Sequence, residues 1–171
     1  MSKSILSFPN PVNEVASRWV AGCVAVICVA AILTQQPWVS AVLAYGFLAR
    51  VAAGPTLSPL GQLATRVLAP RLARRAKLVP GPPKRFAQGI GAALTVAATI
   101  LLFGFRLSLG TYALLGMLAI AATLESVFAL CLGCRLFSAM MRIGLIPPEV
   151  CAACSNINGP AAEALRARSG A

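Results

Sequence analysis

Long uncharged runs alternate with short polar breaks along this chain. The longest run lies between Arg18 and Arg50, and Gln35-Gln36-Pro37 interrupts it near its middle. Proline disfavours a helical conformation in the residue before it, so the break predicts a helical hairpin. The alternative is one long tilted helix, which would leave three spans. The predicted membrane spans are residues 19–34, 38–53, 86–105 and 111–134.

The first two predicted spans are short for a hydrocarbon core of about 30 Å. Arg18 and Arg50 can lengthen them by extending their charges to the membrane interface. Asn10, Asn13 and Glu14 precede the first span. Because Asn side chains accept hydrogen bonds from the first N–H groups of a helix, these residues are candidates to cap it.

The composition indicates that lipid is the solvent of these helices. Apolar residues make up 58% of the 171 residues and charged residues only 11%, against roughly a quarter in soluble domains. An apolar outer face carries no cost in lipid. We therefore expect an all-α, integral membrane four-helix bundle. It forms a single membrane domain over residues 1–157, followed by a flexible tail over 158–171.

Residues 54–85 form a basic connector between the second and third predicted spans. Its cations are Arg66, Arg71, Arg74, Arg75, Lys77, Lys84 and Arg85. The positive-inside rule places such a loop in the cytoplasm, which predicts a multi-pass protein of the inner (cytoplasmic) membrane with both termini in the cytoplasm. Residues 60–72 fit either an amphipathic surface helix or an ordinary basic loop.

The partners expected from this charge pattern are the lipid bilayer and, at the basic connector, anionic lipid. A net charge of +11 would suggest nucleic acid in a soluble protein. Here the cations concentrate between hydrophobic runs, which is a topological pattern. Nucleic acid is not a predicted partner.

Four cysteines near the C-terminal end form the arrangement C-x2-C-x16-C-x2-C, namely Cys131, Cys134, Cys151 and Cys154. This spacing suits a four-thiolate site for zinc or an iron–sulfur cluster. Each C-x-x-C can also act as a redox pair. We expect 131–134 on the last turn of the fourth span, a helix along the interface over 135–145, and a short helix after Pro147-Pro148. Together, 131–154 form a short Cys-rich cytoplasmic segment.

The predicted location narrows the chemistry of these cysteines. Cytoplasmic thiols are normally kept reduced, so a permanent structural disulfide is not expected. A metal site, a transient redox pair and a relay that carries sulfur on cysteine remain. The chain could also be a small transporter or scaffold with incidental cysteines. Cys23 and Cys28 lie five residues apart, on different faces of a helix, and are interpreted as small buried residues.

Glu125 is the remaining candidate for chemistry, because a carboxylate within a span is usually paired or functional. It could relay protons for thiol chemistry, or it could be a structural partner for Arg50, Arg85 or another cation. The chain contains no histidine. This excludes histidine acid–base catalysis, histidine-ligated haem and His-containing zinc sites.

Several motifs resemble those of domain of unknown function 4395, a family of uncharacterised bacterial multi-span membrane proteins. They are FPNPVNE at 8–14, YGFLAR at 45–50, PGPPKRFAQGIG at 80–91, LES at 124–126, CLGC at 131–134 and the C-terminal C-x-x-C with Asn156. The resemblance implies a small membrane protein and no established activity. By association only, it suggests a thioredoxin-like or sulfurtransferase partner.

The outline is also similar to that of membrane thiol oxidoreductases of the vitamin K epoxide reductase type. Those are four-helix bundles with a C-x-x-C on a late span, and they pass electrons to a quinone. Here the C-x-x-C is predicted on the opposite side of the membrane, so a quinone is less favoured. The sequence thus predicts a thiol-redox or sulfur-relay role at the cytoplasmic face, with catalytic candidates Cys131, Cys134, Cys151, Cys154 and Glu125. The alternatives are a metal site at the same four cysteines or a transporter or scaffold.

Overall fold

The computed structural model is mostly helical. It describes residues 12–36, 38–54, 57–63, 78–151 and 167. Three of the described helices are long and apolar enough to cross a membrane: α1 (Glu14–Leu33), α5 (Gly81–Phe103) and α6 (Ser108–Phe128). The apolar helix α2 (Val39–Ala53) has only 15 residues. At 1.5 Å per residue it is about 22 Å long, shorter than a typical hydrocarbon core.

The helix α1 begins as the sequence predicts. The Asn13 side chain accepts hydrogen bonds from the backbone N–H groups of Val15 and Ala16, at 3.0 and 3.4 Å. Asn13 also belongs to the two-residue strand β1 (Val12–Asn13), which pairs antiparallel with β2 (Leu78–Val79). This pairing brings the start of α1 next to the start of α5.

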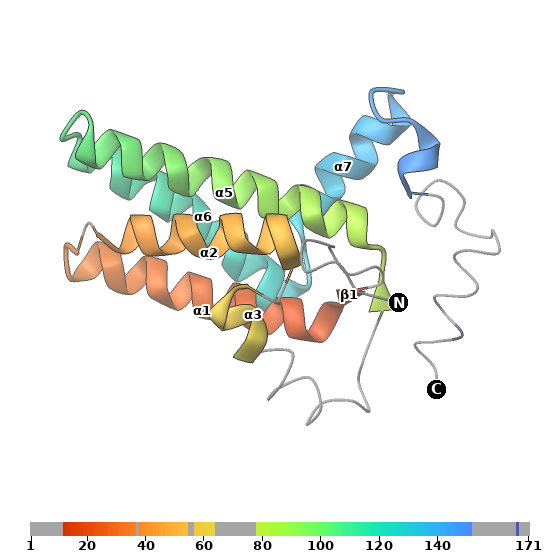
Figure 1. Cartoon of the computed structure of the whole chain (residues 1–171), viewed down its shortest axis with the longest axis horizontal. Helices are drawn as coiled ribbons and strands as arrows, with labels where there is room; N and C mark the ends of the chain where they lie inside the picture. Colours follow the sequence, from red (N-terminus) through yellow and green to blue (C-terminus); the bar gives the residue numbers. More distant parts are fainter. Residues whose placement is uncertain (1–11, 37, 55–56, 64–77, 152–166, 168–171) are drawn as a thin grey trace.

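The predicted break at Gln35-Gln36-Pro37 is confirmed, because α1 and α2 are separate helices. Gln35 has a φ of +55°, in the left-handed region that a continuing helix does not use. A second turn, after α5, contains Arg106 with a φ of +53°. Figure 1 shows both helical hairpin turns at one end of the bundle, opposite the end that carries β1 and helix α7 (Leu132–Arg142).

The main packing pairs are α1 with α6, α2 with α5, and α5 with both α6 and α7. The two helices of the second hairpin, α5 and α6, therefore pack on each other, whereas α1 and α2 of the first hairpin pack mainly on the second. The core consists of small and aliphatic side chains, with Val24, Cys28 and Leu115 at most 1% exposed. Many large apolar side chains on the outer faces are exposed, as expected for helices in lipid. Examples are Leu33, Leu109 and Ile120.

The observed helix α5 begins earlier than the predicted span. The sequence predicts that PGPPKR belongs to the connector and that the span begins at 86, but α5 begins at Gly81 with proline in its first turn. Proline is tolerated there because the first N–H groups have no intrahelical acceptor. Lys84 and Arg85 therefore lie at the start of α5, from which Lys84 reaches Glu125 on α6 and Arg85 reaches the Val51 carbonyl on α2.

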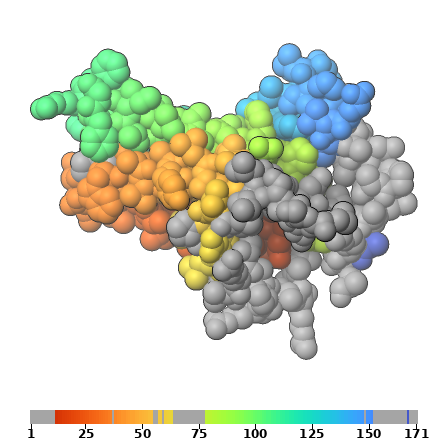
Figure 2. Space-filling model, in the orientation of Figure 1, coloured from red at the N-terminus to blue at the C-terminus, as the bar shows by residue number. Residues whose placement is uncertain are grey.

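Little of the basic connector is available for comparison with the prediction. The helix α3 (Pro59–Leu63) is present, but most of the predicted surface helix over 60–72 falls outside the described residues. The predicted helix over 135–145 is confirmed as α7, and the predicted short helix after Pro147 is the 3-10 turn η4 (Pro148–Cys151). Figure 2 shows α7 and η4 projecting from the end of the bundle.

Candidate functional site

The first C-x-x-C lies at the start of α7, not on the last turn of the fourth span as predicted. The helix α6 ends at Phe128, and Ala129 follows in the left-handed conformation with a φ of +56°. The chain then turns, and Cys131 becomes the N-cap of α7, with its Sγ accepting from the Cys134 backbone N–H at 3.4 Å. Both thiols thus sit at a helix N-terminus, whose partial positive charge favours a thiolate.

The two thiols are electrostatically distinct. A hydrogen bond from the Cys134 thiol lowers the pKa of Cys131 below its usual value; the nearby Lys84 charge acts in the same direction, while burial and Glu125 oppose it. The reciprocal hydrogen bond, followed by burial, raises the pKa of Cys134. Cys131 is therefore the better thiolate of the pair. A C-x-x-C with one activated thiol at a helix start is typical of dithiols that exchange disulfides.

Glu125 is paired with a lysine that the sequence analysis did not name as its partner. Lys84, in the first turn of α5, places its Nζ 2.6 Å from Oε1 of Glu125, near the end of α6. The two side chains are only 9% and 20% exposed. The alternative in which Glu125 pairs with another cation is confirmed. The pair lies close enough to both cysteines to act on them electrostatically.

Two arginines at this end of the bundle, Arg18 and Arg85, donate to backbone carbonyls of a neighbouring helix. Arg18 reaches from α1 to the carbonyls of Ser126 and Val127 at the end of α6, with distances of 2.9–3.1 Å. Arg85 Nε donates to the Val51 carbonyl at 3.0 Å. A cation at a helix C-terminus satisfies its last carbonyls and complements its dipole. Arg18 thereby joins α1 to α6 directly below the C-x-x-C.

Arg50 does not extend to the interface as the sequence analysis expected. It is 5% exposed, and its guanidinium lies 4.3 Å from the centroid of the Phe47 ring. Its Nε donates to the Gly46 carbonyl at 3.0 Å. The reason is the close packing of α2 on α5: a Cβ at Gly91 would lie 2.3 Å from the Phe47 ring. The ring therefore sits on Gly91 and holds the arginine inside the bundle.

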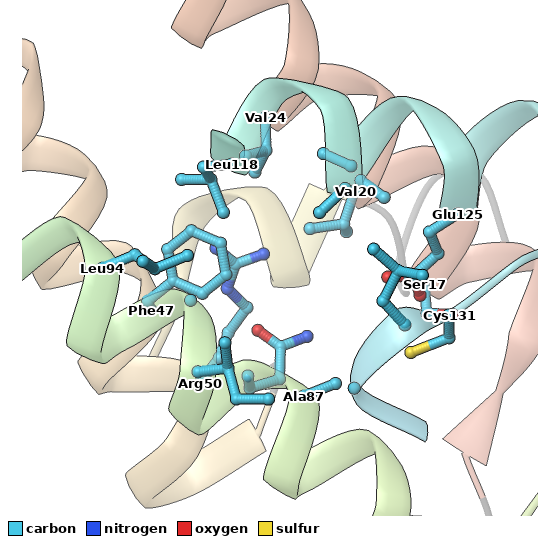
Figure 3. Close-up of a pocket in the computed structure, with 18 of the residues that line it drawn as sticks. Ser17, Val20, Val24, Phe47, Arg50, Ala87, Leu94, Leu118, Glu125 and Cys131 are labelled. Atoms are coloured by element: carbon cyan, nitrogen blue, oxygen red, sulfur yellow. The ribbon is translucent and has the colours of Figure 1, made fainter. Parts of the chain in front are cut away.

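A cavity of about 300 Å³ connects these groups (Figure 3). Side chains of α1, α2, α5 and α6 and the first turn of α7 line it. Most of the lining is apolar, and the polar exceptions are Ser17, Arg50, Gln88, Glu125 and Cys131. In Figure 3 the Cys131 sulfur points toward Ala87 and the cavity. The cavity thus extends from the better thiolate into the part of the bundle built from apolar helices.

Of the second cysteine pair, the structure describes Cys151. Cys151 ends η4, is buried, and is disulfide-bonded, whereas Cys154 lies outside the described residues. Cys131, Cys134, Cys23 and Cys28 are free thiols. Cys28 is fully buried as predicted, whereas Cys23, which was also predicted to be buried, is only partly buried. Among the described residues no group of three potential ligands forms a metal site. The four-cysteine site for zinc or iron–sulfur stays a prediction, and a disulfide-bonded Cys151 cannot supply a thiolate to it.

The first C-x-x-C and Glu125 are predictable from the sequence, but three other residues of this site are not among the predicted ones. Lys84 was placed in the connector, and Gln88 and Gly133 were not singled out. Only Gly133 carried a usable signal, as the small residue inside CLGC. A Cβ at Gly133 would lie 2.6 Å from both Cα and Cβ of Ala87, so its lack of a side chain lets α7 begin directly against α5.

The model of the family called domain of unknown function 4395 matches residues 12–142. The chain belongs to this family. The match covers most of the chain and includes Lys84, Glu125 and the first C-x-x-C, whereas Cys151 and Cys154 lie beyond it. No curated protein and no solved structure shows a significant match to the chain. The site described above therefore falls within the part of the chain that defines membership of the family.

Proposed function

We propose that this family member is a membrane thiol–disulfide oxidoreductase, with Cys131 as the attacking thiol and Cys134 as the resolving thiol. The observation that carries this proposal is the position of the pair at the start of α7. There the Cys131 sulfur caps the helix and accepts from the Cys134 backbone N–H. The pKa of Cys131 is lowered and that of Cys134 is raised, which divides the two roles.

The exchange proceeds in two displacements. The Cys131 thiolate attacks one sulfur of a partner disulfide, a mixed disulfide forms, and the other partner sulfur leaves as a thiolate that takes up a proton. Cys134 then loses its proton and attacks the Cys131 sulfur. This step forms the Cys131–Cys134 disulfide and releases the second partner thiol. In this direction the partner disulfide is reduced by two electrons and the C-x-x-C is oxidised by two. Both displacements are reversible, so the Cys131–Cys134 disulfide oxidises a partner dithiol by the same steps in reverse.

A sulfur relay is the related possibility, because the same thiolate could carry a sulfane sulfur received from a sulfurtransferase. The free thiol of Cys134 favours disulfide exchange. The Cys134 backbone N–H donates to the Cys131 sulfur, so a second thiol lies in the same helical turn as any adduct formed on Cys131 and can resolve it. Cys151 and Cys154 are the second pair in this proposal, exchanging with the first pair or with a thioredoxin-like protein.

The proposed setting is the cytoplasmic membrane, with the C-x-x-C end, the basic connector and both termini in the cytoplasm. All the charged side chains of the site lie at this end of the helices. The connector's arginines and lysines follow the positive-inside rule and can contact anionic lipid. In this arrangement α2 is the fourth span of a four-helix bundle. It packs on α5, and its short length requires local thinning of the bilayer.

The test is to trap the mixed disulfide in cells. A Cys134→Ser variant should accumulate a disulfide adduct on Cys131 with a thioredoxin-like protein, seen on non-reducing gels and identified by mass spectrometry. Cys131→Ser and the buried control Cys28→Ser should give none. Absence of any adduct in Cys134→Ser would refute the assignment.

Metal analysis of anaerobically purified protein tests the competing function. One zinc or iron–sulfur cluster per chain, lost in both Cys131→Ser and Cys151→Ser, would replace the oxidoreductase with the four-cysteine metal site. If every Cys→Ser variant kept wild-type stability and phenotype, the cysteines would be incidental, as in a transporter or scaffold.

A further inference from the structure

The cavity beside Cys131 extends from the thiol pair in among the apolar helices. It continues from Cys131 past Ala87 to Val24 and Leu94 on the apolar helices α1 and α5. A molecule that reaches the sulfur through this cavity has to be soluble in lipid. A protein disulfide does not fit a space of about 300 Å³, which is at the small end of ligand pockets. The cavity suits a single ring whose substituents extend toward lipid.

Two polar side chains in the cavity have capacity left for a ligand. Gln88 Oε1 is buried and accepts no hydrogen bond within the described residues. Arg50 is almost fully buried, and of its nitrogens Nε alone donates to an acceptor in the described part of the chain. Because a buried polar group without a partner is costly, the Gln88 oxygen indicates a ligand with a hydrogen-bond donor such as a hydroxyl. The Arg50 guanidinium, which lines the same cavity, favours an oxygen acceptor on that ligand. Arg50 would donate to one oxygen, and Gln88 would accept from a hydroxyl.

We propose that this cavity binds the head group of a membrane quinone and that the quinone reoxidises the Cys131–Cys134 dithiol. The inference rests on the proposed function and names its electron acceptor. A lipid-soluble quinone suits the apolar lining, and one of its carbonyl oxygens can accept from Arg50. Once it is reduced to the quinol, a hydroxyl can donate to the Gln88 oxygen. The sequence disfavours a quinone because the C-x-x-C is predicted on the opposite side of the membrane from that of the vitamin K epoxide reductase type. This objection does not apply to a cavity that lies among the apolar helices, which a lipid-soluble compound can reach from either side.

The reaction balances without a further reagent. Oxidation of the dithiol breaks two S–H bonds, forms one S–S bond and releases two electrons and two protons. The quinone takes up both electrons and both protons, and its two carbonyls become hydroxyls. Arg50 stabilises the charge that develops on one oxygen as electrons arrive, and Gln88 accepts a hydrogen bond from a hydroxyl of the quinol. The resulting disulfide is the form that can oxidise partner thiols.

The test fills the cavity without touching the thiols. Ala121, on α6, lines the cavity, and Ala121→Leu places three additional carbons there. Ala41 on α2 is exposed, so Ala41→Leu is a matched control. With full-length reduced protein in lipid nanodiscs and decylubiquinone as the probe, Ala121→Leu should slow quinone reduction at least tenfold and Ala41→Leu less than twofold. Exchange with oxidised thioredoxin should stay within twofold in both variants.

A binding measurement tests the cavity without electron transfer, and it also shows whether a slow variant is still folded. Decylubiquinol, which cannot oxidise thiols, should protect Cys131 of the reduced wild type from alkylation, and this protection should be lost in Ala121→Leu. Gln88→Leu should weaken protection at least fivefold, because the quinol hydroxyl then loses its acceptor. A wild type that exchanges with thioredoxin but neither reduces decylubiquinone nor gains protection would overturn the quinone proposal alone. A wild type that shows no exchange with thioredoxin would overturn the proposed function.

Discussion

Replacing Gly133 with alanine tests whether α7 starts directly on α5. The new Cβ would lie 2.6 Å from both Cα and Cβ of Ala87 and 3.4 Å from its N. Because two of these three atoms belong to the backbone of α5, no side chain can rotate away. Ordinary carbon contacts are about 3.5–4.0 Å, so the first turn of α7 has to retreat by about 1 Å. The other contact of α7 with α5, between the rings of Phe86 and Phe137 at 5.6 Å, would loosen with it.

The expected cost follows from overpacking, which is about 1–3 kcal/mol in well-packed protein interiors. Since about 1.4 kcal/mol is a factor of ten in an equilibrium constant, the population with α7 undocked should rise roughly 5- to 150-fold. Cys131 is 9% exposed in the docked form, and a bulky reagent reaches it only after local opening. Its rate of alkylation should therefore rise by the same factor.

The assay is alkylation of reduced protein by a bulky maleimide at fixed pH, with the Cys131 peptide quantified by mass spectrometry. Gly89→Ala is the matched control, because nothing lies within 4 Å of its new Cβ and alanine favours a helix. It should change the rate less than twofold. If Gly133→Ala and Gly89→Ala react at the same rate, the docking of α7 on α5 is not as the structure has it.

Three further predictions concern the same end of the bundle. Lys84→Met should raise the pKa of Cys131 and Glu125→Gln should lower it, because Lys84 favours the thiolate and Glu125 opposes it. The pH midpoint of Cys131 alkylation should therefore rise in Lys84→Met and fall in Glu125→Gln. If both variants shift the midpoint in the same direction, this electrostatic account is refuted. Arg18→Met removes three hydrogen bonds to α6 and should cost about 1.5–3 kcal/mol of stability in thermal unfolding, whereas the exposed Arg142→Gln should cost less than about 0.5 kcal/mol. In intact cells an impermeant maleimide should label the thiols of α7 only after permeabilisation, and direct labelling would invert the proposed topology.

The positions of the helices followed from hydropathy, because an apolar run has few alternatives to a helix in lipid. The break at Gln35-Gln36-Pro37 and the cap at Asn13 were also predictable, since both depend on neighbouring residues. The ends of α5 and α6 were not. The helix α5 begins at Gly81 and includes two prolines, although a proline-rich segment predicts a loop. The helix α6 ends before Ala129, which is in a left-handed conformation, and no glycine or proline there signals the end.

The sequence predicts the thiol pair of the site and Glu125 but not the other groups that surround them. The spacing of Cys131 and Cys134 identified a thiol pair, but a spacing does not say whether the pair starts or ends a helix. The position of the pair at the start of α7 depends on the left-handed turn at Ala129, and this position decides which thiol caps the helix. The partner of Glu125 required the start of α5 to be known, because Lys84 reaches the carboxylate only from the first turn of that helix. Arg50 and Gln88 belong to the site only because four helices converge on one cavity.

The Lys84–Glu125 pair contributes more to the site than to stability. A buried ion pair is a weak source of stability, because desolvation offsets most of its attraction, and apolar residues would suit a bundle in lipid at least as well. Beside Cys131, however, the two charges have opposite effects on the thiolate. A lone carboxylate there would suppress the thiolate, and a lone lysine would stabilise it until it became a poorer nucleophile. Together the two charges oppose each other at the Cys131 thiol, which suits the disulfide exchange proposed for this pair, because such a dithiol has to both donate and accept electrons.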